Sequence, residues 1–370
     1  MICFHPIKAF YPLDKDLDGK RRLLFGQKHY ALASQSEFFI RHYDLKVPKI
    51  ISDGIDSSCY DYPVIYDFTS DGFDIHGLNI KVPCGKCIGC KLDYSRMWAT
   101  RSVHEAFMHD YYKDCAFITL TFNPDMLLRR ENPHSLNKTA FRSWIKRLRR
   151  SIEYKYGKTI RLMACGEYGA KHKRPHYHAI IYGFNFPDKY VWKYNRIRGQ
   201  DVIYYRSPFL EKVWTPAGSD DSFGFSVIGL VNFETSAYVA RYVTKKLFGK
   251  AASVIYKDKE PEFLITSRNP GLGYSYFEKY YKDIFSHGYV TLPNGFKAPI
   301  PRYYSNKLET LNPDLYSKWS IDKQDKMIEN VFIENLDSTR ERLIVREELK
   351  KYNLDVLQRQ YEFNTSQEAF

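Results

Sequence analysis

The chain has 370 residues, 44% of them hydrophobic, which is enough for one large domain or for two or three smaller ones. Lysine and arginine exceed aspartate and glutamate by 13, an excess that favours a polyanionic partner, chiefly nucleic acid. No apolar run approaches the length of a membrane span, and the N-terminus lacks the pattern of a signal peptide. We therefore expect no membrane partner and a cytoplasmic location.

The first half of the chain predicts a β-leaning region, then a helix, a strand and a second helix. Short apolar runs and turn signals such as SDGIDSS predict an irregular, β-leaning region over residues 1–83. Apolar residues at helical spacing predict a helix over 93–112, and CAFITLTF predicts a strand over 115–122. A basic helix is predicted over 137–157, and its cations face either solvent or DNA. These cations are Arg142, Lys146, Arg147, Arg149 and Arg150.

The second half predicts three more strands and another helix. TIRLMACGEYG and PHYHAIIYGF are typical of two strands joined by a hairpin-like connection, and FSVIGLVNF is typical of a third. ETSAYVARYVTKKLFG predicts a helix that ends at Gly249, and residues 307–363 are largely charged and helical. This order predicts an α+β fold, with helices packed on one face of an antiparallel sheet of the split βαβ kind. We expect three regions, at 1–92, 93–250 and 251–370.

Two histidines lie one residue apart at the start of the second hairpin strand. Side chains at i and i+2 share one face of a strand, so His176 and His178 project together and can share a cation. Glu167 ends the preceding strand, and the hairpin brings its carboxylate toward them; His172, within the connection, is the rival third ligand. Two imidazoles and one carboxylate leave positions open for water and substrate, as in a catalytic site for Mg²⁺ or Mn²⁺. The alternative is a pair of exposed polar positions on a strand.

Tyr238 and Tyr242 are four residues apart on the last predicted helix, so they share a face, and Lys245 follows on that face. A phenol near a bound metal ion can attack a phosphodiester and keep the 5′-phosphate as a covalent ester, and two phenols allow two successive transfers. Because the ordinary pKa of a phenol is about 10, a nearby lysine would favour the phenolate. The alternative is a tyrosine pair that packs on the sheet.

Three stretches in order, FITLTF, HYH and YVARYVTKK, resemble motifs I, II and III of the HUH replication initiators. Four others, CFHPIKAF, VPCGKCIGCKLDYSRMWATR, TSRNPGLGY and FKAPIPRYY, resemble the gokushovirus branch of the Microviridae. The resemblance implies that 93–250 is an HUH endonuclease domain, RRM-like in its sheet. It further implies an enzyme that nicks single-stranded origin DNA, forms a 5′-phosphotyrosine adduct and rejoins strands in rolling-circle replication.

The resemblance also implies a role for each candidate site residue. The tyrosines become nucleophiles, the lysine their helper, and the histidines and the glutamate metal ligands, that is Tyr238, Tyr242, Lys245, His176, His178 and Glu167. The segment from Tyr242 to Lys245 also fits the single-tyrosine pattern of such enzymes, in which Tyr238 would be auxiliary.

Three cysteines with the spacing Cys-x-x-Cys-x-x-Cys lie just before the first predicted helix. Each x-x pair lets neighbouring thiolates reach one metal ion, so Cys84, Cys87 and Cys90 predict a structural Zn²⁺ site. Three ligands are one short of a closed tetrahedral site, and either Cys3 or His5 could supply the fourth. Free thiols and an iron–sulfur cluster are the alternatives.

The resemblance implies single-stranded and supercoiled circular phage DNA as the partner, in the cytoplasm of a bacterial host. YGKT, at 156–159, is similar to the end of a P-loop, but Ile152 stands where that motif requires glycine. We therefore expect a host helicase to unwind the DNA. The alternative functions are an HUH relaxase or transposase, and a single-stranded DNA-binding protein without catalysis.

Overall fold

The protein, described here from a computed structural model, divides into two compact units. The first unit is Met1–Lys91 with Ser317–Leu357, and the second is Leu92–Tyr316 with Gln358–Phe370. The structure describes residues 3–12, 64–69, 72–169, 173–197, 200–216, 218–245, 254, 256–336 and 338–366.

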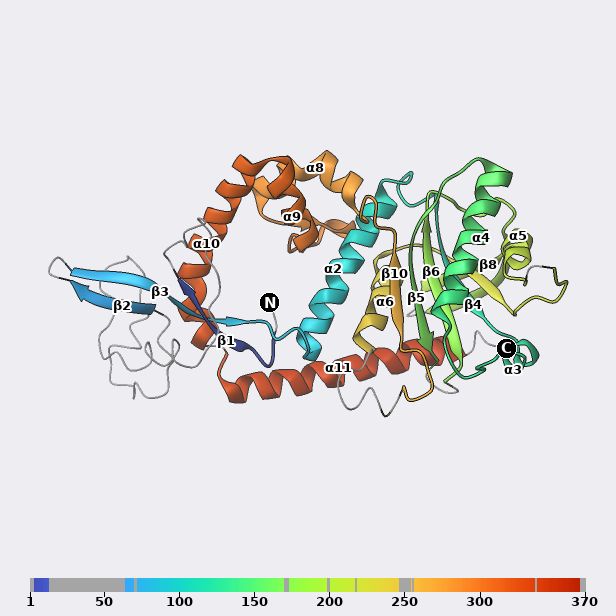
Figure 1. The fold of residues 1–370 in the computed structure, drawn as a ribbon, viewed down its shortest axis with the longest axis horizontal. Coiled ribbons are helices and arrows are strands. Elements are labelled where there is room, and N and C mark those ends of the chain that lie inside the picture. Colours follow the sequence, from blue (N-terminus) through green and yellow to red (C-terminus); the bar gives the residue numbers. More distant parts are fainter. Residues whose placement is uncertain are drawn as a thin grey trace. The chain divides into compact units, whose positions relative to one another are not determined.

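The second unit is built on a seven-stranded sheet with the strand order β10-β5-β6-β4-β9-β8-β7 (Figure 1). Every neighbouring pair in it is antiparallel, which confirms the predicted α+β class with a central antiparallel sheet. The strands are β4 (Cys115–Thr121), β5 (Arg161–Tyr168), β6 (Pro175–Tyr182), β7 (Tyr190–Ile197), β8 (Gln200–Arg206), β9 (Ser226–Gly229) and β10 (Phe263–Thr266).

The centre of this sheet has the expected split βαβ arrangement. β6 lies between β4 and β5 and is antiparallel to both, so β4 and β5 run parallel to each other. The connection between them contains the short helix α3 (Pro124–Leu128) and the long helix α4 (Lys138–Tyr156). The Asn137 side chain accepts a hydrogen bond from the Ala140 amide at the start of α4, and Gly157, with φ of 62°, ends the helix in the left-handed conformation.

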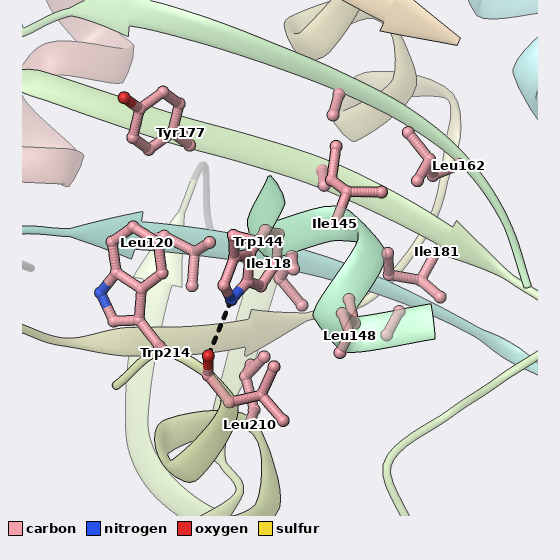
Figure 2. Close-up of a cluster of buried hydrophobic side chains, with 14 of the residues drawn as sticks. Ile118, Leu120, Trp144, Ile145, Leu148, Leu162, Tyr177, Ile181, Leu210 and Trp214 are labelled. Carbon is pink, nitrogen blue, oxygen red and sulfur yellow. Dashed lines mark hydrogen bonds between the residues drawn. The ribbon is translucent and has the colours of Figure 1, made fainter. Parts of the chain in front are cut away.

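α4 packs its apolar stripe on one face of the sheet (Figure 2). The Trp144 indole Nε1 donates a hydrogen bond of 3.1 Å to the Val213 carbonyl at the end of α5 (Pro208–Val213), so its polar group is satisfied inside the core. The buried residues of the stripe are Phe141, Trp144, Ile145, Leu148 and Ile152.

The opposite face is covered by α6 (Phe233–Lys245) and by α2 (Ile88–Phe107), so the expectation of helices on one face is wrong. β5 and β6 are apolar at consecutive positions, which gives each strand two faces to bury. The second core contains Ala106 of α2, Val239 and Ala240 of α6, and the strand residues Met163, Cys165, Ile180 and Tyr182.

Two element boundaries differ from the prediction. The helix predicted over 93–112 begins at Ile88 and ends at Phe107. It ends there because the following turn holds Asp110, Tyr111 and Tyr112 at φ of 48°, 49° and 75°, a left-handed conformation that an α-helix cannot include. The strand expected from FSVIGLVNF stops at Gly229, and its last residue already begins α6.

The rest of the second unit contains two of the stretches on which the resemblance was based. The Gly273 amide donates to Glu105 Oε2 at 2.6 Å, and Arg101 Nε donates to the Leu272 carbonyl at 3.0 Å. The Gly271 amide donates to the Tyr303 hydroxyl at 3.0 Å, so TSRNPGLGY and FKAPIPRYY are tied together and to α2. The elements are α8 (Tyr274–His287), β11 (Val290–Thr291), the 3-10 helix η3 (Pro293–Gly295), β12 (Lys297–Ala298) and α9 (Arg302–Leu311).

The first unit contains a three-stranded antiparallel sheet with the order β1-β3-β2. This agrees with the β-leaning character expected of the N-terminal region, and the helices expected over 307–363 are also confirmed. Among the helices that the structure describes, none has the length and apolar character to span a membrane. The remaining elements are β1 (Ile7–Pro12), β2 (Val64–Thr69), β3 (Gly72–Val82), α10 (Pro313–Leu336) and α11 (Arg340–Ser366).

Candidate functional site

Three neighbouring strands bring polar side chains together beneath α6. Directly opposed residues in a sheet share a face, and two rows of such partners cross β4, β6 and β5 at this end. These rows are Thr119–His178–Cys165 and Thr121–His176–Glu167. The alternate residues Ile118 and Leu120 point to the α4 core, so the strand period aims the polar ones at α6.

His178 has a hydrogen-bond partner at each ring nitrogen. Its Nε2 lies 2.8 Å from Glu167 Oε1, and its Nδ1 lies 3.0 Å from Thr119 Oγ1. A carboxylate oxygen only accepts, so in the neutral ring Nε2 carries the proton and the Thr119 hydroxyl donates to Nδ1. Because that hydroxyl can also accept, the ring can place its proton on Nδ1 and offer a free Nε2 to a cation.

His176 is oriented by the turn that joins the two hairpin strands. Its Nδ1 donates to the Arg174 carbonyl at 2.8 Å, which leaves Nε2 unprotonated in the neutral ring. Burial and then the neighbouring His178 lower the pKa of His176, so the neutral ring is favoured. An added Cβ at Gly169 would lie 3.0 Å from His176 Cε1, so glycine permits this close approach.

Tyr238 reaches the same carboxylate from α6. Its hydroxyl donates to Glu167 Oε1 at 3.1 Å, and its ring stands edge-on to His178 at 90°, with ring centroids 5.1 Å apart. Phe117 of β4 stacks on His178 and meets the Tyr238 ring edge-on. The Tyr238 hydroxyl, the Glu167 carboxylate and the His178 imidazole therefore form one hydrogen-bonded chain across a helix and two strands.

Several predicted site residues lie partly or wholly outside the described set. Tyr242 and Lys245 belong to α6, but the structure describes only their backbone. His172, the rival third metal ligand, lies outside the described residues. The choice between Glu167 and His172, and the roles of Tyr242 and Lys245, stay predictions.

The donor set at this end of the sheet suits a divalent cation in type, since imidazole nitrogens and a carboxylate oxygen bind Mn²⁺, and a carboxylate suits Mg²⁺. Glu167 and His178 lie together, whereas His176 stands apart. Within the described chain, the sole set of three or more His, Cys, Asp or Glu donor atoms lying within 4.8 Å of one another is the cysteine cluster described below. A cation shared by Glu167, His176 and His178 would require these side chains to draw closer, as catalytic groups often do on binding substrate.

Thr119 and Phe117 are site residues that the sequence pattern did not single out. Thr119 is a hydrogen-bond partner of His178, and Phe117 lines both His178 and Tyr238. Both belong to FITLTF, where the period of two sets Phe117 and Thr119 on the face opposite Ile118 and Leu120. Pairing that strand with HYH in the observed register would have identified Thr119.

The predicted cysteines are brought together in the first unit. The sulfurs of Cys3, Cys84, Cys87 and Cys90 all lie within 4.8 Å of one another. His5 instead places its Nε2 2.9 Å from Glu347 Oε2 of α11.

Comparison with known proteins finds similarity to the replication proteins of small phages. The family model of the replication-associated protein ORF2 matches residues 115–247, from the first residue of β4 to just beyond α6. The replication-associated protein VP4 of Bdellovibrio phage phiMH2K is 36% identical over 242 residues, which cover 64% of this chain and 69% of that protein.

Two further relatives match over similar lengths. The replication-associated protein ORF2 of Spiroplasma virus 4 is 30% identical over 259 residues, or 68% of this chain and 75% of that protein. The replication-associated protein ORF4 of Chlamydia phage 1 is 28% identical over 251 residues, or 66% of this chain and 58% of that protein. No solved structure matches this chain.

Proposed function

Because this chain belongs to the family of phage replication-associated proteins, we propose that it initiates the rolling-circle replication of a small circular phage genome. In this role it is a metal-dependent, site-specific DNA endonuclease and strand transferase. Its partners are single-stranded and supercoiled circular origin DNA and a host helicase, in the cytoplasm of the bacterial host. The observation that carries the proposal is the hydrogen-bonded chain from Tyr238 through Glu167 to His178.

The nucleophile in this proposal is a tyrosine of α6. The phenolic oxygen bonds to the scissile phosphorus, the bond from phosphorus to the 3′ oxygen breaks, and the 3′ oxygen takes up a proton and leaves. The 5′-phosphate stays esterified to the tyrosine, and a later attack by a 3′-hydroxyl reverses the step and rejoins a strand. The hydrogen bond from Tyr238 to Glu167 supports Tyr238 as a nucleophile, because the carboxylate can accept the phenolic proton.

Glu167, His176 and His178 are proposed to hold the cation. When bound, Mg²⁺ or Mn²⁺ supplies polarisation of the scissile phosphate and stabilises its developing charge. Thr119 orients His178 through its Nδ1, which supports a ligand role for Nε2. Tyr242 is proposed as the second nucleophile and Lys245 as the cation that favours the phenolate.

The test is covalent capture of origin DNA by the full-length protein. Labelled single strands that tile the phage genome are incubated with protein and Mg²⁺ or Mn²⁺ and resolved on a denaturing gel. We expect a protein–DNA adduct that chelator abolishes. His178→Ala should lower its rate of formation by about 100-fold or more, since the cation supplies several kcal/mol of transition-state stabilisation.

Conservative tyrosine variants separate one nucleophile from two. Tyr238→Phe and Tyr242→Phe should each still form adduct but fail at repeated transfer, and the double variant should form none. Tyr154→Phe and His134→Ala, both at exposed positions, are the matched controls and should behave as wild type. Full adduct formation by the double tyrosine variant would refute the site, and adduct peptides carrying DNA on Tyr242 alone would reduce the enzyme to one nucleophile.

A further inference from the structure

Four cysteine sulfurs from separate stretches of the first unit converge on one point. Cys3 lies before β1, Cys84 and Cys87 lie in the turn between β3 and α2, and Cys90 lies in the first turn of α2. The Sγ atoms of Cys87 and Cys90 are 3.6 Å apart, those of Cys87 and Cys3 are 3.8 Å apart, and those of Cys84 and Cys90 are 4.0 Å apart. All four thiols are free of disulfide bonds.

These separations fit the edges of a tetrahedron around one metal ion. A disulfide bond is about 2.05 Å long, far shorter than the spacing seen here. Zinc–sulfur bonds of about 2.3 Å in a tetrahedron set the sulfurs about 3.8 Å apart. The three separations between 3.6 and 4.0 Å lie around that value. An iron–sulfur cluster holds its thiolates on different irons and so spreads them more widely.

Backbone amides point at the sulfurs, which is a second and independent observation. A neutral thiol is a weak acceptor, whereas a thiolate accepts charge-assisted hydrogen bonds, and thiolates are the form that binds metal. The first turn of α2 contains no acidic residue, so the positive end of the helix also favours thiolates at its start. The contacts run from Cys84 N to Cys3 Sγ at 3.2 Å, from Phe4 N to Cys87 Sγ at 3.3 Å, and from Cys87 N and Lys86 N to Cys84 Sγ at 3.3 and 3.4 Å.

We propose that Cys3, Cys84, Cys87 and Cys90 bind one Zn²⁺ ion, which fastens the N-terminal segment to the start of α2. The geometry assigns the fourth position to Cys3 and not to His5, because the His5 ring is engaged with Glu347. Zinc suits a closed site with four thiolates and no open position, and such a site is structural. Phe4, Ile88 and Leu343 pack around the sulfurs and shield the centre.

A zinc ion here would act by linking stretches that are far apart in sequence. Cys3 and Cys84 are separated by most of the first unit, and fixing both ends of that segment removes conformational freedom from the unfolded chain. The same ion would order the first turn of α2, where Cys90 is a ligand and the Lys91 amide donates to the Cys87 carbonyl at 3.0 Å.

Elemental analysis of the full-length protein, purified without chelator, tests the proposal. We expect about one zinc per chain and little iron. A chain with no zinc that has never met chelator, or one with iron and inorganic sulfide, would overturn the assignment. Co²⁺ exchanged into the site should give the visible absorption and thiolate charge-transfer bands of a tetrahedral sulfur site, and their absence would also overturn it.

Single variants separate this site from other thiols of the chain. Cys84→Ser should lose most of its zinc and unfold at lower temperature, and Cys115→Ala, at a buried cysteine of β4, should keep its zinc. Equal zinc content in both variants would contradict the proposal. If Cys84→Ser does not fold, zinc release from the wild type by a thiol-blocking mercurial, at one ion per four thiols, supports the site, and thiol blocking that releases no zinc refutes it. Because the readout is bound metal, the result does not depend on nicking.

Discussion

Glu167 accepts two hydrogen bonds on a single carboxylate oxygen, from the Tyr238 hydroxyl at 3.1 Å and from His178 Nε2 at 2.8 Å. The residue is 5% exposed, so each charge-assisted hydrogen bond contributes more than it would in water. Replacing Glu167 with alanine would take an acceptor from two donors at once and confuse folding with chemistry. Glu167→Gln keeps an acceptor oxygen and is the cleaner variant for the cation and the phenolic proton.

His104 predicts a loss of stability in mild acid. Burial lowers its pKa to about 4, against a hydrogen bond to the Thr291 carbonyl that raises it. Because the ordinary pKa is about 6.5, the unfolded chain binds more protons between these values, and stability falls as the pH drops through this range by at most about 1.4 kcal/mol per pH unit. Urea unfolding at pH 7 and pH 5 should show this loss in the wild type.

The pH dependence can be assigned to His104 by substitution. His104→Gln removes the titrating group, so its unfolding free energy should change less between the two pH values, although it starts lower because the ring bonds to Tyr304 and Thr291 are altered. His134→Gln, at an exposed position, is the matched control and should keep the slope of the wild type. An unchanged slope in His104→Gln would show that other groups carry the effect.

At the scale of elements, α4 has two functional faces. Its apolar stripe forms the core, and its basic side lines a hollow of about 460 Å³ beside β5 and β10. Three of the five cations there are Arg142, Lys146 and Arg149, and none of the described residues that line the hollow is acidic. Burial and then the charge of Arg161 lower the pKa of Arg149, as expected where cations gather. This arrangement favours DNA contact over a merely solvated helix face.

The basic side of α4 therefore predicts a salt-dependent contribution to DNA binding. Replacing Arg142, Lys146 and Arg149 with glutamine should weaken single-stranded DNA binding and reduce the slope of log K against log salt by about 2, at roughly 0.7 for each phosphate that is no longer neutralised. Fluorescence anisotropy at several salt concentrations measures both. The matched control replaces three exposed lysines of α8 and α9, Lys279, Lys282 and Lys307. Equal losses in the two variants would mean that only total charge matters.

At the scale of the whole molecule, the first unit is completed by residues from near the other end of the sequence. Leu343 of α11 is 8% exposed and packs on Phe4, Cys87 and Cys90. The unit therefore needs its C-terminal stretch for its core as well as its N-terminal one.

A cavity variant tests this joining of the two ends. Leu343→Ala should lower the free energy of unfolding by about 2 kcal/mol, because it removes buried methyl groups and leaves a cavity. Leu349→Ala, at a position of the same helix that is 58% exposed, should cost less than about 0.5 kcal/mol. Chemical unfolding of both variants measures the difference, and comparable losses would show that α11 does not stabilise the first unit through Leu343.

Sequence pattern predicted the centre of the fold and the gathering of the cysteines well, for local reasons. CAFITLTF and PHYHAIIYGF have the composition of strands, and the basic helix has its apolar residues at helical spacing, so each element was recognisable alone. The strands β7, β8 and β10 were missed: YVWKYNRI and QDVIYYR mix aromatic and charged residues, and FLIT is only four residues long.

The sequence by itself determined which residues can share a face: the two histidines at i and i+2, the two tyrosines at i and i+4, and three cysteines two residues apart. Those relations depend only on the period of a strand or helix or on short spacing. Only the tertiary structure decided that Glu167 accepts the Tyr238 hydroxyl, that Thr119 contacts His178, and that helices cover both faces of the sheet. These depend on strand register and on how α6 packs, which arise from contacts between residues far apart in sequence.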